Sequence, residues 1–250
     1  ENHIVACMNI SNPSKVEVIS LLAKDEVTLS NHFSLHDTIN EDYLSLWINH
    51  DHFLESNLNN YCDTFIDESV ITLTNFLRPE KIIEILSSQS DHKAWELAGP
   101  TDYRCFRVSN EFNNEDISTF FMSVSFKSWL SKLTGLTIVH PASPIYTRCL
   151  ESPGNYQILH GNYSEPLGID LIFNYYAKES FQEWSESFCG RVHYLDNEGN
   201  EIFQVSPKNN SLTIVYRSEG CSRFTENIKG FPEFPLFQSI AIFRIAKEAD

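Results

Sequence analysis

The chain has 250 residues, of which 42% are hydrophobic and 13% aromatic, and its 34 acidic and 18 basic residues give a formal charge of −16. This composition suits one large domain with a sizeable core and excludes an intrinsically disordered chain. Phosphates of nucleic acids are bound by clustered Lys and Arg, and the basic residues here are scattered, so no direct nucleic-acid binding is expected. An acidic surface favours basic partners, and no apolar run reaches the ~18 residues of a membrane span, so no membrane association is expected.

The first half of the chain has mainly helical patterns. Asn12 followed by Pro13 is typical of a helix start, and a helix is expected from there to Leu22. His50-Asp51-His52 is expected to be the solvated start of the next helix rather than a metal site, because alternate residues on a helix point apart. The later elements of this half are helices at 51–65, 79–90 and 115–134, the last ended by Gly135, and a β-branched strand at 70–74.

After Gly135 the hydrophobic period changes, which predicts a region of short strands. Turn residues such as those of 196–200 separate eight expected strands, near 145–150, 155–160, 167–177, 190–195, 201–205, 211–217, 221–226 and 236–245. Eight such strands are typical of an antiparallel sandwich or barrel. With the preceding helices packed on the outside of one sheet, the expected class is α+β.

The six cysteines are spread along the chain without a C-x-x-C pair, so neither a zinc knuckle nor a redox motif is indicated. N-x-S sequons occur at Asn9, Asn162 and Asn209, but no secretory signal precedes them. We therefore expect reduced thiols and a location in the nucleus and cytoplasm. Because the sequence begins at Glu1 rather than at Met, we expect it to be a fragment of a longer protein.

Segments in the order found here resemble the C-terminal domain of the ribosomal prolyl hydroxylase family of 2-oxoglutarate- and Fe(II)-dependent dioxygenases. These segments are Trp47–Asn49 (WIN), Ser69–Leu77 (SVITLTNFL), Trp95–Pro100 (WELAGP), Phe126–Leu136 (FKSWLSKLTGL) and Pro207–Leu212 (PKNNSL). The likeness covers residues 40–245 and is nearest to the oxygen-sensing fungal member, in which this part is known as the degradation domain.

The resemblance implies a parent with two tandem double-stranded β-helix domains, of which this chain is the second. Residues 1–45 are then an N-terminal extension or linker. Residues 46–250 are a degenerate double-stranded β-helix, jelly-roll or cupin-like, together with its supporting helices, and 135–250 form the main β-strand region.

The resemblance also implies functions for the parent and for this part. The first domain of the parent is expected to hydroxylate a proline of a ribosomal protein with Fe(II), 2-oxoglutarate and ascorbate. The second domain is expected to act in oxygen sensing and the hypoxia response as a protein-interaction and regulatory domain. Its implied partners are the N-terminal fragment of an SREBP-type transcription factor, whose degradation it promotes, and a negative regulatory protein, with a ribosomal protein or translation factors reached through the parent.

An iron centre of this family needs an H-x-D or H-x-E motif, a distal His and an arginine for 2-oxoglutarate. None of the nine histidines has Asp or Glu two residues later. The vestigial positions are His160 and Asn162 for the motif, Phe224 for the distal His, and Phe237 with Ser239 for the Arg-x-Ser of the last strand. The neutral amide of Asn162 offers a weaker carbonyl oxygen and no charge to offset Fe(II), and a phenyl ring cannot pair with a carboxylate. We therefore expect no catalytic residue, no metal and no cofactor in this chain.

Several classes of function remain open on the sequence. The resemblance and the missing ligands favour a non-catalytic protein-interaction domain. An active Fe(II) oxygenase would need the absent motif, and a cupin-like binder of small molecules would share the fold without an indicated ligand. The domain could also support, or recognise substrate for, the N-terminal domain that hydroxylates the ribosomal proline.

Overall fold

Nine segments of the chain are described by the computed structural model: residues 40–88, 95–98, 104–109, 117–142, 145–150, 156–160, 167–176, 184–230 and 234–246. All belong to the unit that spans residues 33–250. The helix expected at 12–22 lies outside these residues. No helix among them is long and apolar enough to cross a membrane.

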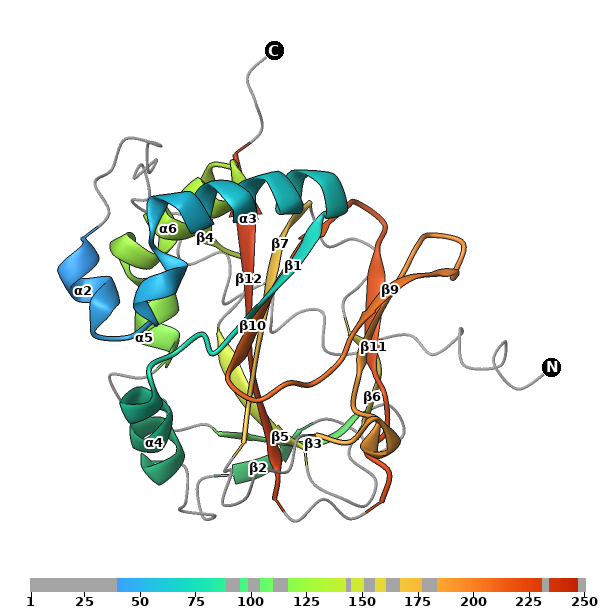
Figure 1. The fold of residues 1–250 in the computed structure, drawn as a ribbon. Coiled ribbons are helices and arrows are strands. Elements are labelled where there is room, and N and C mark those ends of the chain that lie inside the picture. The colour runs from blue at the N-terminus through green and yellow to red at the C-terminus, as the bar shows by residue number, and fades with distance from the viewer. Residues whose placement is uncertain are drawn as a thin grey trace, which may run out of the picture. The chain divides into compact units, whose positions relative to one another are not determined.

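A large antiparallel sheet, the major sheet, has the strand order β1–β10–β7–β12–β5–β3 (Figure 1). Its strands are β1 (Val70–Thr74), β10 (Ser211–Arg217), β7 (Gly168–Tyr175), β12 (Leu236–Ile245), β5 (Tyr146–Leu150) and β3 (Arg104–Ser109), with β2 (Trp95–Ala98) on β3 and β4 (Ile138–Pro141) on β12. Every residue of β7 is buried, as are the first eight of β12. Strands buried on both faces must be covered by structure on both sides.

The minor sheet covers one of these faces. It continues from β3, which pairs with β6 as well as with β5, so the two sheets join at that strand. Its order is β6–β11–β8–β9, with β6 (Tyr156–His160), β11 (Ser222–Thr225), β8 (Val192–Leu195) and β9 (Glu201–Val205). Ile172 and Val215 of the major sheet pack with Val192, Tyr194 and Val205 of the minor sheet. From β5 to β12 consecutive strands lie in alternate sheets, except for β8 and β9, which pair with each other in the minor sheet. The predicted strands agree with the observed ones to within two residues at each end. The predicted α+β class with facing antiparallel sheets is confirmed.

Helices cover the other face of the major sheet (Figure 1). They are α2 (Glu41–Ser45), α3 (Glu55–Glu68), α4 (Pro79–Ser88), α5 (Ile117–Met122) and α6 (Val124–Thr134), with single 3₁₀ turns η2 (His50–His52) and η4 (Glu186–Phe188). The single helix expected at 115–134 is two helices, because the Ser123 hydroxyl donates to Phe120 O and accepts from Phe126 N at 3.2 Å. Gly135 ends α6 in the left-handed region, with φ of 70°, as expected.

Aromatic side chains fill the space between the helices and the major sheet. Phe76, Phe120 and Phe126 are fully buried and pack around Trp129 and Phe173, with ring centroids of neighbouring pairs 4.9–6.3 Å apart. The Trp129 indole donates to His52 O at 2.8 Å, so its one polar group is satisfied inside the core.

Several elements of the fold lie before the main β-strand region that was predicted at 135–250. Helix α2 precedes residue 46, and its Leu44 is fully buried in the aromatic core. Strand β1 pairs with β10 over five consecutive residues, and β2 and β3 extend the sheet at its far end. The main β-strand region predicted at 135–250 therefore leaves out β1, β2 and β3, because β10 and β5 take neighbours from the preceding half of the chain.

Candidate functional site

Charged side chains fill the interior between the two sheets. Asp170 of β7 accepts hydrogen bonds from Arg217 Nε at 3.1 Å, from Arg223 Nη1 and from the Tyr194 hydroxyl at 3.2 Å. Each of these four side chains is at most 2% exposed. A carboxylate is stable at such a depth only when charged donors surround it, which the two guanidinium groups do.

A second interior group centres on Arg148 of β5. Its Nε donates to Gln238 Oε1 at 2.7 Å, its Nη2 donates to Thr225 Oγ1 at 2.6 Å, and Gln238 Nε2 donates to Asn174 Oδ1 at 2.7 Å. Burial lowers the pKa of Arg148 to about 10, so it stays charged at neutral pH. Burial and the nearby Asp170 hold the pKa of Tyr194 well above its ordinary value, so its phenol remains a neutral donor.

The first pair of vestigial positions lies at the edge of this interior. His160 is the last residue of β6, and its Cα partner on β11 is Arg223. Asn162 lies outside the described residues. Phe224, expected to replace the distal His, instead stacks on His193, with centroids 4.6 Å apart and planes 5° apart, while Arg223 faces Asp170. The assignment to Phe224 is one residue off, because successive strand residues face opposite sides of the sheet.

The position assigned on the last strand, β12, is also one residue off. Phe237 packs on Trp95 and Tyr175, with centroids 5.6 and 5.5 Å away, and belongs to the core under the helices. Ser239 Oγ lies 2.7 Å from Thr147 Oγ1 on the same face. The residue of β12 that points into the barrel is Gln238. Phe237 therefore does not occupy the interior position at which the 2-oxoglutarate arginine was expected.

The described residues do not fit Fe(II) or 2-oxoglutarate. The interior position opposite His160 carries the Arg223 guanidinium, which repels a metal cation and already binds Asp170. The interior position on β12 carries a neutral amide that Arg148 and Asn174 occupy. In the part of the chain that the structure describes, no group of three His, Cys, Asp or Glu side chains suits a metal ion.

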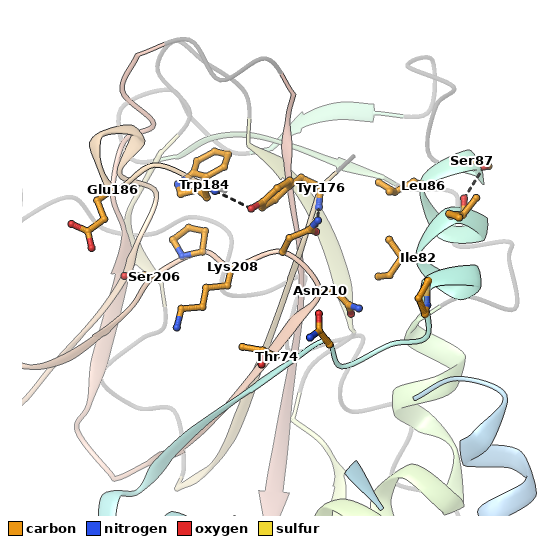
Figure 2. A pocket seen from close by; sticks show the side chains of 15 residues that line it. Thr74, Ile82, Leu86, Ser87, Tyr176, Trp184, Glu186, Ser206, Lys208 and Asn210 are labelled. Atoms are coloured by element: carbon orange, nitrogen blue, oxygen red, sulfur yellow. Dashed lines mark hydrogen bonds between the residues drawn. The ribbon is translucent and has the colours of Figure 1, made fainter. Parts of the chain in front are cut away.

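A groove with a volume of about 1060 Å³ lies between α4 and the segment 206–210. Figure 2 shows Ile82 and Leu86 of α4 on one side and Tyr176 and Trp184 on the other. Ile83 adds a side chain that is 65% exposed. Exposed Lys208 and Glu186 border the groove. The groove therefore combines apolar walls with a charged rim, as protein-binding surfaces do.

Backbone contacts made by two asparagines fix the shape of the groove. Asn210, at φ of 49°, accepts from Leu77 N at 2.8 Å and donates to Leu77 O at 2.7 Å, while its own carbonyl accepts from Phe76 N. Asn209 Oδ1 accepts from Tyr176 N at 3.0 Å. The PKNNSL and SVITLTNFL segments thus meet here, and the residues that carry the resemblance hold the walls together.

The aromatic wall of the groove is also held in place. The Tyr176 hydroxyl accepts from Trp184 N at 2.9 Å, and the Trp184 indole donates to Cys189 O at 2.9 Å. Tyr176 stacks on Phe234 with centroids 4.8 Å apart. Tyr176 is 2% and Trp184 9% exposed, so these rings form a fixed support beneath the groove and offer a partner little contact area.

His50 and His52 differ from each other in their surroundings. His52 is 6% exposed, and its Nε2 lies 3.1 Å from Thr74 O and its Nδ1 3.2 Å from the Tyr61 hydroxyl. His50 is exposed, as expected, and His52 is not. The two residues lie in the turn η2, and the helix that was expected to start here begins at Glu55. Burial lowers the pKa of His52, only partly offset by its contacts with the Thr74 and Asn75 carbonyls, so the ring is neutral at pH 7.

Sequence reasoning missed both the interior network and the groove. A signal for the network was present, because Arg148, Asp170 and Arg217 each place a charge in a predicted strand of apolar residues. A charge inside a buried strand indicates a partner on a neighbouring strand. No comparable pattern marks the groove, whose walls come from segments far apart in the sequence.

Comparison with known proteins shows the family and the fold of the chain. The family model described as oxoglutarate and iron-dependent oxygenase degradation C-term matches residues 39–230. The chain belongs to this family. Its members are parts of oxygenases that use Fe(II) and 2-oxoglutarate. The chain is 22% identical to mouse "Prolyl 3-hydroxylase OGFOD1" over 79% of its length, and 24% identical to the Drosophila melanogaster "Prolyl 3-hydroxylase sudestada1" over 77%. It spans 47% and 41% of these two relatives.

Solved structures support the fold. A prolyl hydroxylase from Trichoplax adhaerens, in complex with a hypoxia inducible factor oxygen degradation domain peptide fragment, superposes with a TM-score of 0.55 at 14% identity, over 76% of this chain and 90% of its own. A Pseudomonas putida prolyl-4-hydroxylase gives 0.52 at 12% identity, over 75% and 98%. At this identity the likeness shows the fold, which is the double-stranded β-helix expected from the sequence.

Proposed function

We propose that this domain is a non-catalytic protein-interaction domain that promotes degradation of an SREBP-type transcription factor and is bound by a negative regulator. Membership of a family described by its degradation function supports the proposal. The observation that carries it is the interior of the barrel, where Arg223 and Asp170 form an ion pair at the position opposite His160. With that interior position taken, binding on the outer surface is the remaining use of the scaffold.

We assign the groove between α4 and 206–210 to the transcription factor fragment. Ile83 and Leu86 of α4 supply accessible apolar side chains that an amphipathic segment could cover, and the hydrogen-bonded Tyr176 and Trp184 hold the opposite side in place. The degradation domain itself is proposed to act in the nucleus and cytoplasm. Fe(II), 2-oxoglutarate and ascorbate are proposed to serve the catalytic half of the parent.

A pair of matched variants tests this assignment. Ile83 in the groove and Ile66 on α3 are both helical isoleucines with 65% exposure, so replacing either leaves the core intact. Ile83→Asp should weaken binding of the purified transcription factor fragment ~tenfold or more, because it places a charge in the apolar wall, whereas Ile66→Asp should not. In cells that lack the parent, the chain should shorten the half-life of the transcription factor, and Ile83→Asp should not. Equal binding and equal half-lives with the two variants would refute the assignment of the groove to the transcription factor.

A second candidate function is support or substrate recognition for the catalytic half, with a ribosomal protein or translation factors as partners. The chain spans less than half of its curated relatives, which favours a role within a larger protein. On this alternative, the chain alone would leave the half-life of the transcription factor unchanged. Adding it to the separately purified catalytic half would instead raise hydroxylation of the ribosomal proline.

A further inference from the structure

Strand β9 (Glu201–Val205) forms the outer end of the minor sheet. It is the last strand in the sheet order and pairs, among the described strands, with β8 alone. Four of its five residues are exposed or half-buried, and Ile202 is 52% exposed. A strand in this position presents N–H and C=O groups on its outer side that another strand can pair with.

The edge is held in a fixed conformation. Phe203 stacks on the fully buried Tyr194 with ring centroids 4.6 Å apart, and Val205 is buried, so the inner side of β9 is anchored in the interior. At the preceding turn, the Asp196 carboxylate accepts from Glu198 N at 2.9 Å and from Asn200 N at 2.8 Å. An added strand would therefore meet an already ordered template.

The charge around the edge has one sign. Residues 196–205 contain Asp196, Glu198 and Glu201 and no Lys or Arg. Glu219 lies at the same end, because its neighbour Gly220 packs against Asn197, where an added Cβ would lie 3.5 Å from Asn197 Cβ. Glu201 contacts His193 Nδ1 at 2.5 Å, and hydrogen bonds from Asn200 lower the pKa of Asp196. Asp196 therefore remains ionised at neutral pH, and Glu198 and Glu219 place two further acidic side chains at the same end of the strand.

This charge decides between possible occupants. Two copies of the chain carry the same formal charge of −16, which opposes their pairing through β9. A segment with Lys or Arg would be attracted instead. We propose that the free edge of β9 is a docking site for an extended, Lys- or Arg-bearing segment of a partner protein, which adds as a strand to the minor sheet. This site is separate from the groove and does not depend on it.

Short synthetic peptides provide the test. A peptide that alternates lysine and valine should bind the purified chain, its affinity should fall with salt, and amides of residues 201–205 should gain protection from hydrogen exchange. The glutamate–valine counterpart should not bind. The same lysine peptide with alternate backbone nitrogens methylated should lose binding, because it cannot complete the ladder of hydrogen bonds.

Charge-reversal variants provide the matched control. Glu198→Lys with Glu219→Lys should weaken binding of the lysine peptide ~tenfold or more, whereas Asp63→Lys with Asp67→Lys, at exposed positions of α3, makes the same change in net charge and should not. Ile202→Lys should also weaken binding, because it adds a repelling charge on the edge. Equal binding of the methylated peptide, or equal effects of the two double variants, would overturn the proposal. So would a dimer of the chain that Ile202→Lys dissociates while the peptide fails to bind.

Discussion

Asp170 is the single described carboxylate that two buried arginines share, which makes it the most consequential residue of the interior. Its replacement by Ala removes the charge that compensates Arg217 and Arg223 at a depth where water cannot take its place. We expect Asp170→Ala to lower the free energy of unfolding by about 3–5 kcal/mol in urea denaturation.

A variant at an exposed carboxylate is the control for that measurement. Glu80 is exposed on α4, and its side chain pairs with Arg78, itself half exposed, across 3.4 Å. Glu80→Ala should therefore change the free energy of unfolding by no more than ~1 kcal/mol. If Asp170→Ala cost as little as this, the network would be ruled out as a determinant of stability.

His52 gives the domain a dependence of stability on pH. Its folded pKa is lowered, chiefly by burial, below the 6.5 of the unfolded chain. The unfolded state therefore binds the proton first, so this contribution to stability is complete above pH ~6.5 and falls as the pH is lowered below it. The difference in unfolding free energy between the wild type and His52→Gln should shrink between about pH 7 and pH 5, as measured by thermal melts across that range. If the difference in unfolding free energy stayed constant over this pH range, the lowered pKa of His52 would be contradicted.

The element that joins β1 to α4 depends on Asn210. Its amide spans the backbone of Leu77 with two hydrogen bonds, and its φ of 49° lies in the left-handed region. Asn210→Gly keeps that backbone conformation and loses the bonds, so it should cost about 1–3 kcal/mol. Asn210→Ala should cost about 1 kcal/mol more, because alanine resists a positive φ. Calorimetric melting of the two variants separates the loss of the hydrogen bonds from the cost of the positive φ. If Asn210→Gly were the less stable variant, this role of Asn210 would be contradicted.

The elements were predictable to the extent that local pattern decides them. Strand β1 was predicted with its observed bounds because its β-branched run is local, and Gly135 ends α6 as glycine commonly does. The side of the sheet that each side chain faces was less predictable. A slip of one residue on β11 and on β12 exchanged Arg223 for Phe224 and Gln238 for Phe237, which reversed the side of the sheet. The break at Ser123 was missed because apolar residues continue on both sides of it.

The whole molecule should contain six reduced thiols. Cys62, Cys189 and Cys221 are free thiols in the structure, and burial raises the pKa of Cys221, which keeps that thiol protonated and slow to react. A colorimetric thiol reagent should titrate six groups in denaturant and fewer in the native state, because Cys189 and Cys221 are buried. Fewer than six in denaturant would indicate a disulfide and an oxidising location.

The pairing of β1 with β10 bears on how the chain is made. The hydroxyls of Thr72 and Thr213 lie 2.9 Å apart, although 141 positions separate them in sequence. During translation at about 5–20 residues per second, β1 leaves the ribosome roughly 7–30 s before its partner strand does. Over that interval the β-branched segment β1 lacks its partner strand β10 and can pair with other segments. The nascent chain is therefore a candidate client for a holdase chaperone until residues near 217 have emerged.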